Sequence, residues 1–152
     1  MAFKLGAEGK VYYKVGGQSG GGAWLELTNV RDVTASQEAG DADATTRGNA
    51  STGFMASIPT LKDASVDFEM VWDTSDAGFT AIKNAFYAVA AADKIIGLEV
   101  FDGDRTDGGT QGLRGDFAIP KFDRSEPLND LMKVAVTAKL AYSDTPPSWV
   151  TI

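Results

Sequence analysis

Strict alternation of apolar and polar side chains sets the strongest limit on how this chain can fold. In residues 64–72 the apolar side chains fall at every second position, as Ala64, Val66, Phe68, Met70 and Trp72. Residues 132–142 repeat the pattern over a longer span, and the positions between the apolar ones include Lys133, Thr137 and Lys139. A two-residue period places alternate side chains on opposite faces of a β-strand. Each stretch therefore predicts a strand with one face in a core and the other toward water or a partner.

Further segments have the composition of strands, and clusters of Gly, Asp, Asn and Pro separate them. We expect these additional strands at residues 9–15, 23–36, 54–59, 94–101, 113–119 and 121–125. The second segment is expected to break near Thr28 and Asn29. Pro120 interrupts the last two, which form either one broken strand or two, and Pro59 favours an edge or a strand end. The chain is thus expected to form about seven strands.

One helix is predicted after Trp72. Asp73 and Asp76 resemble a capping box and place carboxylates at the helix N-terminus. Apolar residues then recur at helical spacing, as Phe79, Ile82, Phe86 and Val89. This predicts an amphipathic helix of about four turns that ends near residues 90–92 and packs on a sheet. The expected fold is mainly β with one packed helix (α+β), an antiparallel β-sandwich or barrel in a single domain spanning residues 1–152.

Charge and composition exclude several classes of function. The chain carries 14 Lys and Arg against 21 Asp and Glu, a formal net charge of -7. No window forms the basic stripe that binding to nucleic acid or to an anionic membrane requires. The sequence contains no cysteine and no histidine, which excludes disulfides, Ser-His-Asp and Cys-His catalysis, and typical zinc sites. We therefore predict no catalytic residue, no metal and no cofactor.

The N-terminal sequence MAFKLGAEGK lacks the apolar run of a signal peptide. No segment approaches the ~20 apolar residues of a membrane-spanning helix. We expect synthesis in the cytoplasm and no membrane insertion.

Two acidic features allow a functional and a plain interpretation. The segment DGDRTDGG, from Asp102, resembles a calcium-binding loop, but Thr106, Asp107 and Leu113 stand where the motif needs an acidic ligand or Asn, a glycine and a glutamate. A hairpin turn is therefore favoured over an ion site between Asp102 and Asp107. Asp67 and Glu69 lie ~7 Å apart on one strand face, a separation compatible with a glycosidase carboxylate pair. Solvated strand faces carry such pairs routinely, so the plain interpretation is favoured again.

The stretch EAGDADATTRGNAS opens a polar segment, residues 38–53, that is long for a loop in a compact domain. Its hydrogen-bonding and fork-shaped side chains argue against a disordered spacer. We interpret it as an inter-subunit loop, with the candidate contact residues Asp41, Asp43, Thr45, Thr46, Arg47 and Asn49. Near the other end, residues 143–152 are expected to form a C-terminal arm, because Pro146 and Pro147 interrupt the strand pattern. Trp149 on that arm either folds back on its own domain or anchors in a neighbour's pocket.

Several stretches together resemble the major tail tube protein of long-tailed (siphovirus-type) bacteriophages and prophages. They are WLELTNVRDVT, DADATTRGN, TLKDASVDFEMVWD, AGFTAIKNAF and YSDTPPSW, and they extend from about Trp24 to Trp149. The resemblance implies a structural virion protein whose hexameric rings stack into a hollow tube for DNA ejection. In such a tube the inner strands join into a barrel around the DNA channel, a helix packs outside, and loops and arms grip the adjacent ring.

The resemblance also implies partners. These are copies of the chain itself, the tape-measure protein, and the tail terminator and distal tail proteins, in a virion tail assembled in the host bacterial cytoplasm. DNA would pass through the lumen without specific binding, and Asp67 and Glu69 are candidate lumen-facing carboxylates that would repel it. Two alternatives are a tube protein like that of type VI secretion and a carbohydrate-binding or adhesin β-sandwich of a tail.

Overall fold

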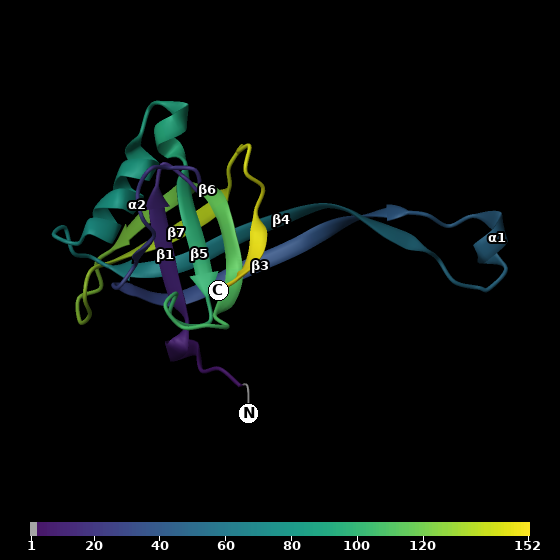
Figure 1. Ribbon diagram of the computed structural model, residues 1–152, viewed down its shortest axis with the longest axis horizontal. Helices are drawn as coiled ribbons and strands as arrows, with labels where there is room; N and C mark the ends of the chain where they lie inside the picture. Colours follow the sequence, from purple (N-terminus) through teal and green to yellow (C-terminus); the bar gives the residue numbers. More distant parts are fainter. Residues whose placement is uncertain (1–2) are drawn as a thin grey trace.

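The protein is built on one curled, antiparallel β-sheet (Figure 1). The computed structural model describes residues 3–152. Seven strands run in the order β2-β1-β5-β6-β7-β4-β3, and β8 pairs with β6 beside this path. The strands are β1 (Lys10–Val15), β2 (Leu25–Glu26), β3 (Val30–Asp43), β4 (Ser57–Val71), β5 (Ile96–Phe101), β6 (Gln111–Ser125), β7 (Lys133–Leu140) and β8 (Ser148–Thr151). The mainly β, α+β prediction is confirmed, with one curled sheet in place of two packed ones.

The core lies between this sheet and the helix α2 (Ala77–Tyr87). The alternating residues Val66, Phe68 and Met70 of β4 are at most 3% exposed, as the sequence pattern predicts. Val134, Val136 and Ala138 of β7 face the same core. Phe79 of α2 packs edge-on against Trp72 at 4.9 Å between ring centroids. Burial of these apolar faces is the main force that holds the helix on the sheet.

Helix α2 is confirmed, but it begins three residues later than the capping box at Asp73 and Asp76 predicts, and it ends sooner. The Asp76 carboxylate accepts a hydrogen bond from the Phe79 amide at 2.8 Å, so Asp76 is the N-cap. The helix has 11 residues, about three turns, because Ala88 leaves the helical conformation with ψ of 144°. Val89 is therefore outside the helix and 92% exposed. Short 3₁₀ turns occur at η1 (Gly6–Glu8) and η2 (Ala91–Lys94), the second leading into β5. Among residues 3–152, no helix is long and apolar enough to cross a membrane.

Both predicted interruptions in the strand pattern are present. A turn at Thr28 and Asn29 separates β2 from β3. Pro120 lies inside the single strand β6, where Ile119 and Pro120 together lie opposite Ala138 between two regular pairs. This bulge accommodates the missing amide hydrogen of proline without ending the strand.

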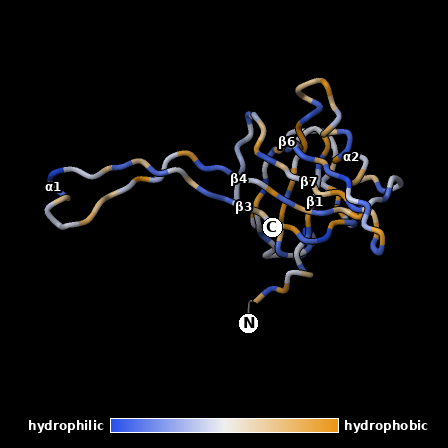
Figure 2. Tube along the Cα trace, turned by 180° about the vertical axis from the view of Figure 1, so that it is seen from behind, coloured by the Kyte–Doolittle hydropathy of each residue, from blue (hydrophilic) through white to orange (hydrophobic). Residues whose placement is uncertain are grey.

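The segment predicted as a polar loop, residues 38–53, is largely an extension of the sheet. Strands β3 and β4 remain paired from Ser36 and Ser65 out to Asp43 and Ser57, while β7 pairs with β4 only between Ser65 and Val71. Residues 38–63, which we call the arm, therefore project from the body as a two-stranded ribbon (Figures 1 and 2). The sequence pattern did not predict these strands because neither face of the arm is buried, so no alternation marks them.

The C-terminal segment, residues 143–152, differs from the expected free arm. After Pro146 and Pro147 the chain returns as β8 and pairs antiparallel with Gln111–Arg114 of β6. That flank of β6 is free because β7 ends at Leu140, opposite Phe117. Trp149 lies on β8, where its indole donates to the Gln111 side chain at 3.0 Å and its side chain is 63% exposed, so anchoring in a neighbour's pocket stays a prediction.

Candidate assembly surfaces

The distal end of the arm is a small folded unit, residues 44–56, which we call the arm tip. The Ala44 amide donates to the Ala56 carbonyl at 2.9 Å, and the Ala56 amide donates to the Thr45 hydroxyl at 2.9 Å. Between them lies the short helix α1 (Arg47–Ala50), capped by Thr46. The Thr46 amide donates to Oδ1 of Asn49 at 2.6 Å, and the Asn49 amide donates back to the Thr46 hydroxyl at 3.4 Å. Reciprocal bonds of this kind fix the start of a helix.

Most of the predicted contact residues serve this internal structure. The Asp43 carboxylate accepts the Thr45 amide at 2.9 Å, which holds the pKa of Asp43 below its usual value. Asp43, Thr45, Thr46 and Asn49 are thus brought together at the end of the arm, where they bond to one another and to nearby backbone. Asp41 lies farther back, opposite Pro59. Arg47 is exposed on α1 and forms no ion pair within the described chain.

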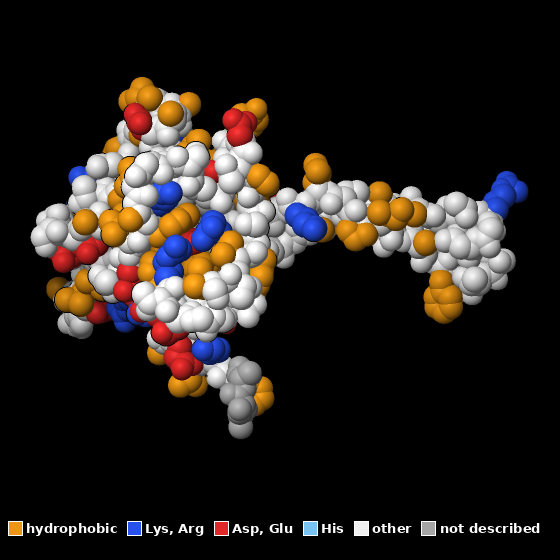
Figure 3. Space-filling view, in the orientation of Figure 1, with side chains coloured by type: hydrophobic (Ala, Val, Ile, Leu, Met, Phe, Trp, Pro, Cys, Tyr) orange, Lys and Arg blue, Asp and Glu red, His pale blue; other side chains and the backbone are white. Residues whose placement is uncertain are grey.

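Sequence reasoning missed the apolar side chains of the arm. Phe54 and Met55 follow the arm-tip helix and are 78% and 82% exposed, and Ile58 and Leu61 on β4 are also exposed. Figure 3 shows hydrophobic side chains along the arm and at its distal end. Large apolar groups left in water at such positions mark interaction surfaces. The signal in the sequence was FMASIP, which was interpreted as a short strand at an edge or a strand end without considering its exposed apolar side chains.

A second candidate surface is the face of β4, β7 and β6 opposite the core. Asp67 accepts a hydrogen bond from the Thr137 hydroxyl at 2.7 Å, and Thr137 lies opposite Lys121 on the next strand. Glu69 lies opposite Ala135, which lies opposite Asp123, and the Lys121 ammonium is 3.5 Å from the Asp123 carboxylate. The face therefore carries Lys121 beside the carboxylates of Asp67, Glu69 and Asp123, and a lumen-facing position for Asp67 and Glu69 stays a prediction.

A third surface surrounds a buried carboxylate at the other end of the sheet. Glu99 on β5 is 0% exposed, and it accepts hydrogen bonds from Arg105 and, at 2.5 Å, from Arg114. Trp24 lies over the two guanidinium groups, at 5.7 and 5.4 Å from its ring centroid. Burial lowers the pKa of both arginines, and the neighbouring Arg114 lowers that of Arg105 further. This cluster covers the outer face of β5 around Glu99.

The Asp102–Asp107 segment forms the turn between β5 and β6. The Asp104 carboxylate accepts the Thr106 amide and hydroxyl at 2.9 and 2.8 Å and pairs with Lys10 at 3.1 Å. These contacts, that with Thr106 first, lower the pKa of Asp104 to about 2. Asp102 accepts the Gln111 amide. Over residues 3–152, no group of three acidic, His or Cys side chains is arranged to hold a metal ion.

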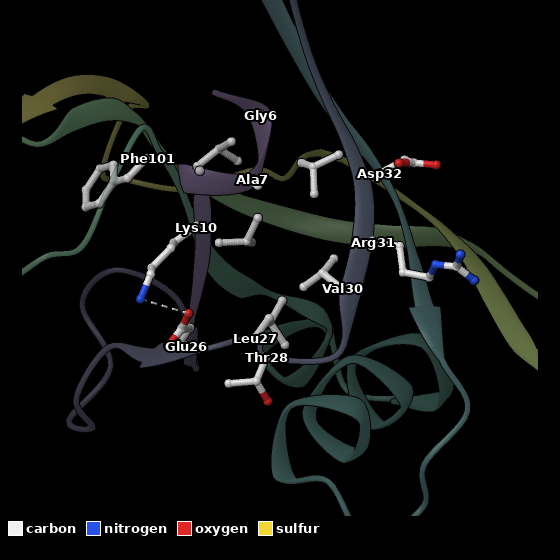
Figure 4. Close-up of a pocket in the computed structure, with 14 residues that line it drawn as sticks. Gly6, Ala7, Lys10, Glu26, Leu27, Thr28, Val30, Arg31, Asp32 and Phe101 are labelled. Carbon is white, nitrogen blue, oxygen red and sulfur yellow. Dashed lines mark ion pairs between the residues drawn. The ribbon is translucent and has the colours of Figure 1, made fainter. Parts of the chain in front are cut away.

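Two cavities open on the body. The larger, about 770 Å³, lies between β1 and β3, and its rim carries Lys10, Glu26, Arg31 and Asp32 (Figure 4). Lys10 pairs with Glu26 at 3.4 Å across one side of it. The smaller, about 470 Å³, lies beside the C-terminal half of α2 and is lined mainly by apolar side chains, with Asp93 at its edge. We call it the α2 pocket.

Comparison with known proteins bears on the fold and the mode of assembly. No family model matches this chain, and no curated protein matches it. Among solved structures, the SPP1 tail tube covers 99% of this chain and 80% of its own, with 12% identity and a TM-score of 0.71. The chain has a tail tube fold.

Gene transfer agent particles give two further matches to this tail tube fold. The tail of the empty particle, described with C6 symmetry, covers 99% of both chains with 15% identity and a TM-score of 0.67. The virion of the native particle covers 98% of this chain and 100% of its own, with 15% identity and a TM-score of 0.66. Because coverage is nearly complete, the likeness extends over the arm as well as the body.

Proposed function

We propose that this chain is the structural subunit of a phage tail tube, forming hexameric rings that stack into a conduit for DNA. The observation that carries the proposal is the full-length likeness to tail structures, one of them described with C6 symmetry. The exposed arm, interpreted from the sequence as an inter-subunit loop, has a partner surface in such an assembly. The same observation favours a non-enzymatic role.

Two physical features support assembly with copies of the chain. The sheet is open, with β2 at one edge and β3 at the other. Open edges present unpaired amide and carbonyl groups, and joining the strands of several subunits into one barrel removes them. The arm projects away from the body with both faces in water, and such a ribbon is marginally stable until it packs against something.

The remaining partners follow from the resemblance noted in the sequence. A tail tube contacts a tape-measure protein inside and terminator and distal tail proteins at its ends. We place the protein in the virion tail, with assembly in the cytoplasm of a bacterial host. The polar arm residues Asp41, Asp43, Thr45, Thr46, Arg47 and Asn49 then lie in the segment that bridges stacked rings, and Trp149 is exposed on the β8 surface for a neighbouring subunit.

Negative-stain microscopy of the purified protein tests this function directly. We expect rings, or tubes whose diameter equals that of a single ring. Monodisperse monomers at all concentrations would contradict the proposal. The matched variant replaces residues 40–61 by Asn-Gly, because Ala39 and Lys62 lie opposite each other and a two-residue turn joins facing strands. This variant should fold, by circular dichroism, and fail to form tubes. Normal tubes from it would show that the arm does not bridge rings.

A further inference from the structure

We propose that the arm tip of one subunit docks in the α2 pocket of another copy of this chain, with Phe54 and Met55 as apolar anchors and Arg47 paired with Asp93. The inference rests on the proposed tube function and names the two surfaces that meet. In this proposal the main contacts between subunits are made by the apolar residues Phe54 and Met55, and not by the polar arm residues that the sequence predicted.

The first step is that the polar side chains of the arm tip are already engaged. Thr45, Thr46 and Asn49 bond to each other and to the returning chain at residue 56. They hold the tip in shape and have little capacity left for a partner. What the tip presents outward is Phe54 at 78% exposure, Met55 at 82%, and the unpaired Arg47. Aromatic residues, Met and Arg are the side chains enriched in the cores of protein interfaces.

The second step concerns which surface fits these groups. The α2 pocket is lined by Ala81 and Ala85 on the helix, by Ala88 directly after it, and by Val15 and Ile95. Its volume, about 470 Å³, lies in the ~300–1,000 Å³ range of pockets that enclose a ligand. Asp93 at its edge is exposed and, within residues 3–152, forms no ion pair. An apolar hollow with one free carboxylate complements an apolar tip with one free guanidinium.

The larger cavity fits the tip less well. The charged side chains of Lys10 and Glu26 lie at one side of it, and Lys10 is already paired with Glu26 and Asp104 (Figure 4). Inserting Phe54 there would remove these charges from water without giving them new partners, which is unfavourable. The α2 pocket imposes no such cost on the apolar anchors.

The third step is that the contact must join different copies. The arm leaves the body on the side away from α2, and both views show the tip at the far end of the molecule from that helix (Figures 1 and 2). A contact between two different patches is heterologous, so each subunit keeps a free tip at one end and a free pocket at the other. Such contacts propagate into rings or filaments and do not close into dimers. This is the behaviour that a stacking subunit needs.

Cysteine cross-linking tests the contact cleanly, because the natural sequence has no cysteine. A chain carrying Met55→Cys and Ala88→Cys should form a ladder of disulfide-linked multimers when assembled under mild oxidation. Met55→Cys paired with Leu128→Cys, a 97% exposed site on the β6–β7 loop, is the control and should give no ladder. A ladder that ends at dimers, or equal ladders in both chains, would overturn the proposed contact.

Charge reversal provides the second test and does not depend on cysteine chemistry. Arg47→Glu and Asp93→Lys should each raise the concentration needed for assembly by roughly tenfold or more, since like charges then meet. The double variant restores the opposite pairing and should assemble near the wild-type concentration. Tubes that form normally from both single variants would overturn the contact and leave the tube function standing. Failure of the unmodified protein to assemble at all would overturn both.

Discussion

At the scale of single residues, Glu99 shows how the body of the protein holds a charge inside. Its carboxylate is fully buried, while the side chains of Arg105 and Arg114 remain 26% and 25% exposed. The arginines can therefore reach water and the glutamate cannot. The sequence KIIGLEVF gave no sign of this arrangement, because the two loops that cover Glu99 come from residues 16–24 and 102–110, far apart in the chain.

This asymmetry predicts unequal effects of removing either partner. Arg114→Met should lower the free energy of unfolding by about 3 kcal/mol, because it leaves a buried carboxylate with one cation. Glu99→Gln should cost less, since the amide oxygen still accepts hydrogen bonds and the arginines remain in contact with water. Urea unfolding of the two variants measures both values. A larger loss of unfolding free energy in Glu99→Gln than in Arg114→Met would contradict the view that the buried carboxylate needs its arginine partners more than they need it.

At the scale of elements, predictability follows burial. The strands around Val66 and Val134 and the existence of α2 were predicted because one face of each is buried and leaves a period in the sequence. The arm strands were missed because residues 38–43 have no buried face to create that period. Strand β8 was missed for another reason: its partner Gln111–Arg114 is distant in sequence, and two prolines precede it. Polar residues of the arm were predicted as contacts, whereas no role was predicted for its exposed apolar residues Phe54 and Met55.

The β5–β6 turn offers a prediction of pH dependence. Asp104 has its pKa lowered from 3.8 to about 2 in the folded protein, first by Thr106 and then by Lys10. Its ionised form therefore stabilises the fold fully above pH ~4, and this contribution disappears as the pH falls through about 2. The stability difference between wild type and Asp104→Asn should shrink steadily from pH 5 to pH 2 in urea unfolding.

Asp107→Asn in the same turn is the control for this prediction, because no hydrogen bond or ion pair of the Asp107 side chain is found in the described chain. Its stability difference from wild type should stay constant over the same pH range. A constant difference for Asp104→Asn as well would show that Thr106 and Lys10 do not favour the ionised carboxylate.

At the scale of the whole molecule, the face of β4, β7 and β6 opposite the core is accessible in the single subunit. We propose that this face lines the lumen of the assembled tube. Asp67 and Glu69 share this face with Lys121 and Asp123. Three carboxylates and one lysine leave these four positions with an acidic balance, so DNA would meet no basic track that binds it. Cryo-electron microscopy of assembled tubes locates Asp67 directly. An exterior position would contradict the proposal.

A variant makes the same lumen prediction measurable in solution. Asp67→Lys with Glu69→Lys turns the face basic, and its tubes should retain duplex DNA in a salt-dependent way. Glu126→Lys with Asp144→Lys changes the net charge equally at exposed positions elsewhere. Equal DNA retention by both variants would mean that charge alone, without position, accounts for the effect.

The two-sided exposure of the arm also bears on the order of events during assembly. Keeping a ribbon straight without a third strand costs backbone entropy that its own ladder hardly offsets. If the arm tip docks in the α2 pocket of another copy, each docking event offsets that entropy cost for one subunit. The end of an assembled tube presents several α2 pockets at once. Starting an assembly is then slow and extending one is fast. Free subunits can then accumulate without forming many short assemblies. Growth starts preferentially at a ring that is already complete, because that ring presents a full set of α2 pockets.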